Sequence, residues 1–262
     1  MTTDTATTIA ATTPTATNSA ALLHAHLAAA KTNHYATRES GDTVELVERP
    51  DGGFTMVLVD GQGHGMPAKL LSLQLTAKAV ALIKEGVRDG AVARAVSDYL
   101  HAYRGGRVSA TLDLLSLDLH AGSVLATRNA EVAGILRHEG QYTVLEATAG
   151  PLGFTRHTRP AVWHHDMAAG LAVVLYTDGI ARAGERFGAT LDPVAALADL
   201  DDPDAPAQTL ADTLLTAAVA ADHGRPHDDM TVIALTITNR DEATVIRRLT
   251  ANIPLVMRRR DG

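Results

Sequence analysis

The sequence contains no cysteine, and this absence excludes several kinds of chemistry at once. There can be no disulfide framework, no thiolate nucleophile and no zinc site built on cysteine. Any metal ion would be bound by carboxylates, carbonyls or imidazoles. That set of ligands favours Mg, Mn or Ca over softer ions.

Aromatic residues and positive charge are also scarce. Aromatic residues make up only 3% of the 262 residues, so the core must be built from Ala, Val, Leu and Ile. Lys and Arg total 23 against 30 Asp and Glu, which gives a net charge of −7. A negative charge disfavours binding to phosphate backbones and to anionic membranes. The composition therefore predicts a globular protein with no nucleic-acid or membrane partner.

Targeting signals are missing as well. No basic residue precedes Lys31, so the N-terminus lacks the charged region of a secretory signal. Apolar runs such as 171–176 are far shorter than the roughly 20 residues needed to cross a bilayer. These absences predict a cytoplasmic protein.

The chain divides into three parts by composition. Residues 1–18 are rich in Thr and Ala, which predicts a disordered tail. Residues 19–238 form a single expected domain, beginning with an Ala/Leu-rich helix over 19–31. Residues 239–262 form an extension with a helical start and a basic end. The terminal segments are candidates for a homodimer contact or for packing on the chain's own core, and the sequence leaves both open.

Strand and helix patterns alternate in blocks along the domain. The expected elements are strands at 42–49 and 54–59, helices at 67–86 and 91–103, four β-like stretches between 109 and 146, a strand at 171–177, helices up to about 222 and a strand at 230–238. The four β-like stretches predict one antiparallel meander. Hairpins with helix pairs between them indicate an α+β protein, in which helices cover antiparallel sheets.

Acidic residues stand at the ends of the expected strands. Asp42 opens the first strand, and Asp60 and Asp178 each follow an apolar strand. Asp228 and Asp229 directly precede the last strand. Each acid alone is explained by turn chemistry, because Asp-Gly after an apolar run is a common turn. Together, acids aimed at one point would repel each other, which predicts one or two divalent cations between them.

The segment 60–65, Asp-Gly-Gln-Gly-His-Gly, lies where a phosphate-binding loop would lie, between a strand and a helix. It does not fit the dinucleotide fingerprint, because Met66 occupies the position of the third glycine. Asp60 at its head would also repel a phosphate. An acid followed by glycines suits a cation instead, because glycine lets a backbone carbonyl turn toward the ion.

Five short motifs carry a resemblance to a known family. They are Ser40-Gly41-Asp42, Asp60-Gly61-Gln62-Gly63-His64-Gly65, Pro151-Leu152-Gly153, Tyr176-Thr177-Asp178-Gly179-Ile180 and Asp228-Asp229-Met230-Thr231-Val232. Through them the sequence resembles the metal-dependent type 2C (PPM) serine/threonine protein phosphatases, in the bacterial SpoIIE-like branch. The resemblance covers about residues 42–237 and implies a four-layer αββα sandwich, two antiparallel sheets flanked by helices.

The resemblance also implies a site with two Mn²⁺ or Mg²⁺ ions. Asp60 would bridge both ions, while Asp42 and the carbonyl of Gly61 would serve one of them. Asp178 and Asp228 would hold the other. Asp60 and Asp178 are therefore the expected catalytic residues. The implied reaction is hydrolysis of phosphoserine or phosphothreonine by a metal-activated water, without a covalent intermediate.

Several positions depart from relatives in the family. Gln62 stands where eukaryotic members have a histidine that assists the leaving group, which leaves the acid unassigned. His64 fits the Gly-His-Gly of the bacterial branch, where we expect a structural hydrogen bond rather than acid catalysis. Arg38 lies near the position of a phosphate-binding arginine in some relatives, so Arg38 and His64 are candidates for substrate binding. Asn129 is neutral where some members have an acid for a third metal.

The resemblance implies a phosphorylated protein as partner. In bacteria this branch often acts on STAS-domain anti-anti-sigma or stressosome proteins, which implies a role in sigma-factor and stress signalling. Two other interpretations stay open: a catalytically weak relative that uses the fold to bind a partner, and a metal-stabilised interaction domain with no turnover. Hydrolysis of a generic phosphate ester with Mn²⁺, abolished by a chelator, separates the first interpretation from the other two.

Overall fold

The computed structural model describes residues 22–200, 202, 204–240 and 246–254. Residues 23–239 form one compact unit. The predicted tail at 1–18 lies outside the described residues, and so do 241–245 and 255–262 of the predicted C-terminal extension. The described part of that extension, 246–254, has no regular secondary structure, and residues 241–245 near the start of the extension, where a helix is expected, lie outside the described residues.

In the described part of the chain, ten strands form two five-stranded antiparallel sheets. The strands are β1 (Leu23–Thr32), β2 (Asp42–Glu48), β3 (Phe54–Gly61), β4 (Ala110–Asp118), β5 (Ser123–Asn129), β6 (Gly134–His138), β7 (Gln141–Leu145), β8 (Ala161–Asp166), β9 (Ala172–Tyr176) and β10 (Met230–Asn239). Sheet A has the order β1-β10-β9-β6-β7, and sheet B the order β2-β3-β4-β5-β8.

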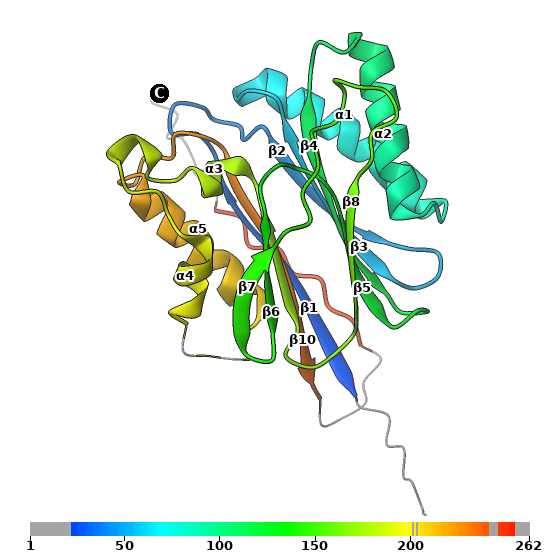
Figure 1. The fold of residues 1–262 in the computed structure, drawn as a ribbon, viewed down its shortest axis with the longest axis vertical. Helices are drawn as coiled ribbons and strands as arrows, with labels where there is room; N and C mark the ends of the chain where they lie inside the picture. The colour runs from blue at the N-terminus through cyan, green and yellow to red at the C-terminus, as the bar shows by residue number, and fades with distance from the viewer. Residues whose placement is uncertain (1–21, 201, 203, 241–245, 255–262) are drawn as a thin grey trace, which may run out of the picture. The chain divides into compact units, whose positions relative to one another are not determined.

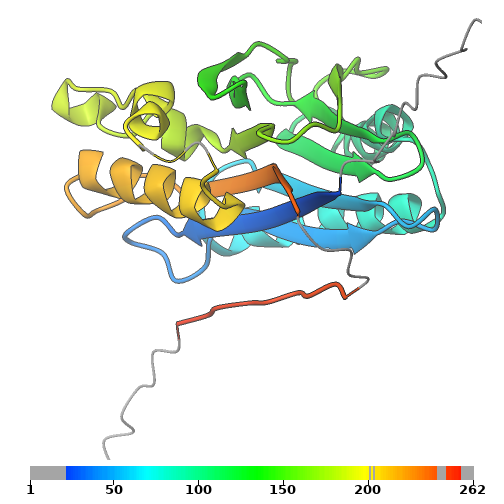
Figure 2. The same cartoon turned by 90° about the horizontal axis from the view of Figure 1, so that it is seen from below.

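Helices cover the outer face of each sheet. They are α1 (Gly65–Lys84), α2 (Asp89–Arg104), α3 (Asp178–Ala181), α4 (Pro193–Ala198) and α5 (Ala207–Ala221), with the 3-10 helix η1 at Glu185–Phe187. Figure 1 shows α1 and α2 on the side of sheet B, and α4 and α5 on the opposite side. Figure 2 shows β1 and β10 side by side in sheet A. The α+β four-layer arrangement implied by the resemblance is confirmed.

The period-two alternation of strand side chains builds the layers. Along β3, Val57 and Val59 pack against α1 and α2, whereas Met56 and Leu58 face sheet A. The strands of sheet A alternate in the same way between the inter-sheet core and the helices α3 to α5. Because both faces are apolar, the two sheets are held between two helical layers.

The helix expected over 19–31 is wrong for its described residues, which form β1. This strand pairs with β10 over its whole length, from Leu23 opposite Asn239 to Thr32 opposite Met230. Alanine favours a helix in isolation, but the free edge of sheet A overrides that preference. Alanines occupy both faces of the strand, so the period-two pattern is hidden in the sequence.

The expected single meander between 109 and 146 is also wrong in its connectivity. Its four strands exist, but β4 and β5 belong to sheet B, whereas β6 and β7 belong to sheet A. The chain crosses between the sheets after Asn129, at the end of β5. The edge strand β8, which pairs with β5, has two adjacent histidines among its residues and was not expected.

Helix α1 is the one helix among the described residues that is long and apolar enough to cross a membrane by length and composition. Its buried residues, such as Leu71, Leu75 and Ile83, pack in the core against sheet B. The core helix of a folded domain meets the same criterion.

A buried ion pair lies in the layer between the sheets. Arg128 on β5 is opposite Asp113 on β4 and donates from Nε to Oδ1 at 2.7 Å and from Nη2 to Oδ2 at 3.2 Å. Its third donor, Nη1, reaches the carbonyl of Ala147, which follows β7 of sheet A, at 3.3 Å. The guanidinium therefore connects the two sheets.

Replacing Arg128 with Ala is expected to lower the free energy of unfolding by about 3–5 kcal/mol, because the buried Asp113 loses its partner. Chemical denaturation measures the change, with Arg94→Ala on the exposed face of α2 as the control. The double variant Arg128→Met with Asp113→Leu should recover much of the loss. Equal instability of the single and double variants would show that the unpaired charge is not the cause.

Candidate functional site

The candidate site lies at one end of the layer between the two sheets. Asp60 continues the alternation of Met56 and Leu58 along β3, so its side chain faces sheet A where the apolar core ends. Thr177, directly after β9, and Thr231 on β10 approach the same region from sheet A, since both hydroxyls contact a carboxylate of sheet B. The strand pattern thus directs polar groups from both sheets to one place.

Asp42 is buried opposite Asp60 in the register of β2 and β3. Its Oδ2 accepts hydrogen bonds from Thr231 Oγ1 at 2.6 Å and from Thr177 Oγ1 at 3.1 Å. Its Oδ1 is buried and has no hydrogen-bond partner among the described residues. Burial raises the pKa of Asp42 to about 6 although the two hydroxyls stabilise the charge. A buried carboxylate oxygen without a partner is suited to a cation or to ordered water.

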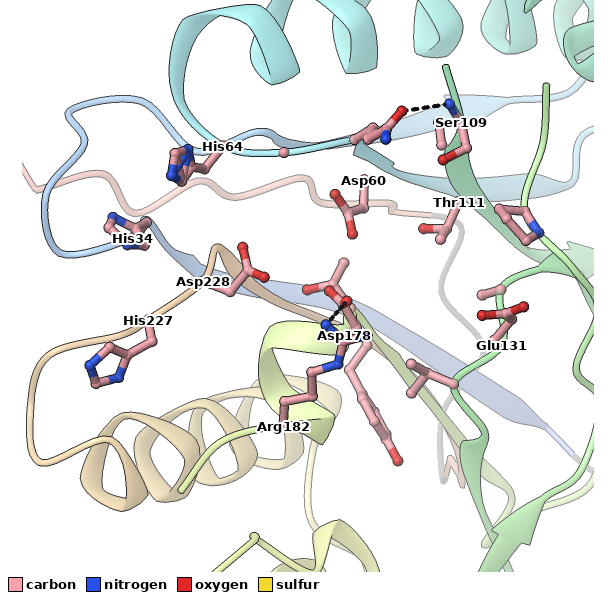
Figure 3. Close-up of a pocket in the computed structure, with 18 of the residues that line it drawn as sticks. His34, Asp60, His64, Ser109, Thr111, Glu131, Asp178, Arg182, His227 and Asp228 are labelled. Carbon is pink, nitrogen blue, oxygen red and sulfur yellow. Dashed lines mark hydrogen bonds and ion pairs between the residues drawn. The ribbon is translucent and has the colours of Figure 1, made fainter. Parts of the chain in front are cut away.

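A cavity of about 520 Å³ opens beside these residues. Figure 3 shows Asp60, Asp178 and Asp228 pointing into the same space, and all three line the cavity. Burial and repulsion by neighbouring carboxylates raise the pKa of Asp60 well above its usual range. Burial, followed by repulsion from Asp178, also raises the pKa of Asp228. Ionising Asp60 and Asp228 is therefore unfavourable unless positive charge is placed beside them.

Two glycines allow the turns that carry these acids to approach the rest of the fold. A Cβ on Gly61 would collide with the carbonyl oxygen of Ala68 in the first turns of α1. A Cβ on Gly179 would collide with the carbonyl oxygen of Asp229. Glycine at these positions lets backbone segments pack directly against each other, next to Asp60 and Asp178.

The two acids before β10 have different surroundings. Asp228 lines the cavity, whereas Asp229 is buried and accepts from the backbone amides of His34 at 2.9 Å and Gly41 at 2.7 Å. Asp229 therefore anchors the loop between β1 and β2, which leads to Asp42. This anchoring holds the start of β2 next to the start of β10.

Of the other residues expected at the site, one lines the cavity and three do not. Gly61 and Asp42 are buried and are not among the residues that line the cavity. Arg38 is exposed and also does not line it. His64 lines the cavity at the N-cap of α1, with its ring centroid 4.9 Å from that of His34. Its side chain makes no capping hydrogen bond.

Gln62 is held in place at the edge of the cavity. Its side-chain Oε1 accepts from the backbone N–H of Ser109 at 3.0 Å, and its backbone N–H donates to the carbonyl of Ser109 at 3.3 Å. This double contact joins the loop after β3 to the segment before β4. A side-chain amide therefore stands where some relatives have a histidine. Unlike an imidazole, an amide does not titrate near neutral pH and cannot serve as a general acid.

Asn129 has a structural role. Its buried amide donates to the Gly150 carbonyl at 2.9 Å and to Thr158 Oγ1 at 2.8 Å. The acid on this side of the cavity is Glu131, two residues further along the chain (Figure 3).

Several residues of the cavity were not singled out from the sequence. They are Glu131, Arg182 and Arg186, together with the imidazoles of His34 and His227. The sequence does indicate Arg182, because it follows Asp178 by four residues and helical spacing brings such a pair together. The Nη1 of Arg182 lies 3.2 Å from Asp178 Oδ2. The imidazoles carried no such signal, because the fold alone brings them to the cavity.

The donor atoms around the cavity are oxygens and imidazole nitrogens. In the described part of the chain, no three carboxylate or imidazole groups are already arranged to hold one metal ion. The unpartnered Asp42 Oδ1 and the mutually repelling Asp60, Asp178 and Asp228 nevertheless make an oxygen set of the kind that Mg²⁺ and Mn²⁺ bind, with carbonyls and water completing the shell. The residues present therefore fit divalent cations.

Comparison with known proteins identifies the family. The model of the family described as Stage II sporulation protein E (SpoIIE) matches residues 50–238. Stage II sporulation protein E of Priestia megaterium is 20% identical over 197 residues, which cover 74% of this chain and 33% of that protein. The chain thus spans about a third of the length of that relative.

Solved structures share the fold. The PP2C phosphatase domain of SpoIIE from Bacillus subtilis, with a fragment of its regulatory domain, superposes with a TM-score of 0.73 at 20% identity, covering 84% of this chain and 65% of that one. The catalytic domain of the serine/threonine phosphatase PstP, in complex with two manganese ions, superposes with a TM-score of 0.60 at 16% identity, covering 82% and 99%. The chain belongs to the SpoIIE family and has the fold of PP2C-type phosphatases.

Proposed function

We propose that this protein is a metal-dependent serine/threonine protein phosphatase that uses the cavity as its active site. The observation that carries the proposal is the convergence of Asp60, Asp178 and Asp228 on one space, with raised pKa values at Asp60 and Asp228. Family membership supports it. A carboxylate cluster that resists ionisation is a site built to bind cations.

In this proposal, two Mn²⁺ or Mg²⁺ ions are bound by the carboxylates and by the Gly61 carbonyl. The carboxylates that would hold them are those of Asp42, Asp60, Asp178 and Asp228. When bound, such ions would supply an acidified water for in-line attack on phosphorus and would offset negative charge on the phosphoryl oxygens. The PstP structure with two manganese ions supports the two-ion count.

The chain's own residues contribute position and charge. The Thr177 and Thr231 hydroxyls fix Asp42 Oδ2, which leaves Oδ1 available to the site. Lys31 and Lys69 donate from Nζ to the Asp42 carbonyl at 2.9 and 2.8 Å. These two ammonium groups lie beside Asp42, and their positive charge stabilises the ionised form of the nearby carboxylates.

The proposed substrate is a phosphorylated protein in the cytoplasm, of the STAS-domain class that includes anti-anti-sigma and stressosome proteins. Purified protein loaded with Mn²⁺ should release phosphate from p-nitrophenyl phosphate and from phosphorylated STAS-domain proteins of the same genome, and a chelator should abolish both. Absence of turnover with either metal, combined with tight binding of a STAS-domain protein, would favour a partner-binding regulator instead.

Because Gln62 is fixed by its contacts with Ser109 and cannot donate a proton, we expect turnover to depend steeply on the pKa of the leaving group. Without an imidazole at this position, an activated aryl phosphate should react readily and a phosphoserine peptide slowly. Gln62→His is expected to raise turnover on the poor leaving group selectively, because a positioned general acid contributes about 10²- to 10⁴-fold. Turnover is measured over a series of aryl phosphates of different leaving-group pKa.

His64→Ala is the companion variant for this series. We expect it to leave the slope against leaving-group pKa unchanged and to act through stability or the Mn²⁺ requirement. A much steeper slope in His64→Ala, with melting temperature and metal requirement unaltered, would identify His64 as the acid and contradict its structural assignment.

A further inference from the structure

Two arginines line the cavity beside the carboxylates. Arg182 directly follows α3, and Arg186 lies in η1. Among the described residues that line the cavity, these two are the only lysines or arginines. They stand on the side of sheet A, on the segment that continues from Asp178 (Figure 3 labels Arg182).

A phosphoryl group entering this cavity meets a strongly acidic lining. A phosphoserine carries a charge of about −1.5 to −2 at neutral pH. The lining includes Asp60, Asp178, Asp228 and Glu131. Cations held by the carboxylates reduce the repulsion, but the outer phosphoryl oxygens still need hydrogen-bond donors. A guanidinium supplies two parallel N–H donors that match a phosphate, and its charge does not depend on pH.

The contact that Arg182 makes is easily exchanged. Its Nη1 lies 3.2 Å from Asp178 Oδ2, and the arginine side chain is 67% exposed. An exposed pair at this i,i+4 spacing contributes little to stability, because water screens the two charges. The base of the side chain is fixed, because the Arg182 amide donates to the Asp178 carbonyl at 2.9 Å. The guanidinium can therefore leave Asp178 for a ligand while it stays at the cavity.

We propose that Arg182 binds the phosphoryl group of the substrate, an inference that rests on the proposed phosphatase function. This assignment differs from the one that the sequence suggested, since Arg38 is exposed and does not line the cavity. Arg182 lies next to Asp178, a carboxylate that would bind a cation. The guanidinium of Arg182 is therefore well placed to donate to a phosphate oxygen near that cation. Arg182 is thus a substrate-binding residue that needs no rearrangement of the fold.

The test combines kinetics with a binding measurement that needs no turnover. In Arg182→Ala, KM for p-nitrophenyl phosphate should rise about tenfold or more, because a charge-assisted hydrogen bond is lost. The Kd for phenylphosphonate, which the enzyme cannot hydrolyse, should rise by a similar factor in calorimetric titration of the Mg²⁺-loaded protein. Arg182→Lys should retain part of the affinity. Arg94→Ala, an exposed arginine on α2, should leave both values unchanged.

The outcomes separate the roles that Arg182 could have. An unchanged Kd for phenylphosphonate in Arg182→Ala, together with a higher Mg²⁺ requirement, would mean that Arg182 only positions Asp178, and the proposal would be wrong. The proposal would also be wrong if the wild-type protein bound no phenylphosphonate. If the wild type shows no turnover but binds phenylphosphonate through Arg182, the phosphatase proposal fails and the binding assignment stands.

Discussion

Asp60→Asn is expected to lower phosphatase turnover by several orders of magnitude while the fold persists. The amide keeps the shape of the side chain but loses the negative charge that a shared metal ligand supplies. Asp60 is close enough to Asp42, Asp178 and Asp228 for all three carboxylates to raise its pKa, so its charge lies at the centre of the cluster. Turnover of p-nitrophenyl phosphate at saturating Mn²⁺ measures the effect, with Asp212→Asn on the exposed face of α5 as the matched control.

The same substitution should have the opposite effect on stability when no metal is bound. Asn at position 60 removes one member of a group of carboxylates that repel each other, so the melting temperature of the chelated variant should equal or exceed that of the chelated wild type. Near wild-type turnover in Asp60→Asn at saturating Mn²⁺ would sink the assignment of the site. A strongly lowered melting temperature would mean that Asp60 has a structural role instead.

Removal of divalent metal is expected to abolish activity and to lower the melting temperature of the wild type. A metal that binds only the folded state stabilises it by mass action, by about 2.7 kcal/mol when its concentration is a hundred times its dissociation constant. For a chain of this size such a change corresponds to several degrees. Thermal unfolding with Mn²⁺ and with excess chelator measures it, and equal melting temperatures would count against a clustered metal site.

The pH dependence of the metal-free protein follows from the raised pKa values. Burial raises the pKa of Asp42 from 3.8 to about 6, so the folded state binds this proton more tightly than the unfolded state does. Stability due to such a group is fully present below the unfolded pKa and is lost as the pH rises through the folded one. The chelated protein should therefore lose stability between about pH 4 and 6, and the Mn²⁺-loaded protein should lose less. Equal slopes would contradict the role of the carboxylates.

The local sequence was sufficient to locate the acids of the cavity, because strand alternation and strand ends are local features. Asp60 ends a run in which apolar residues alternate between two faces, so its position in the layer follows from β3 itself. Asp178 and Asp228 adjoin β9 and β10, which are neighbours in sheet A. Pairing of the strands then brings the acids together.

Other features depend on contacts that no local pattern shows. An alanine-rich segment becomes β1 only because β10 leaves an edge to pair with. The spacing of Arg182 from Asp178 is local, but no local pattern shows that Arg38 lies outside the cavity. The same holds for Asp229, which is adjacent to Asp228 but anchors the loop before β2.

The most direct test of the account is a calorimetric titration of metal-free protein with Mn²⁺, carried out on the wild type and on Asp60→Asn. We expect the wild type to bind about two ions per chain, as a two-metal phosphatase site requires, and Asp60→Asn to lose most of this binding. Asp212→Asn should bind as the wild type does. Equal stoichiometry and affinity in wild type and Asp60→Asn, or no binding by either, would contradict the claim that this cavity is a metal-dependent phosphatase site.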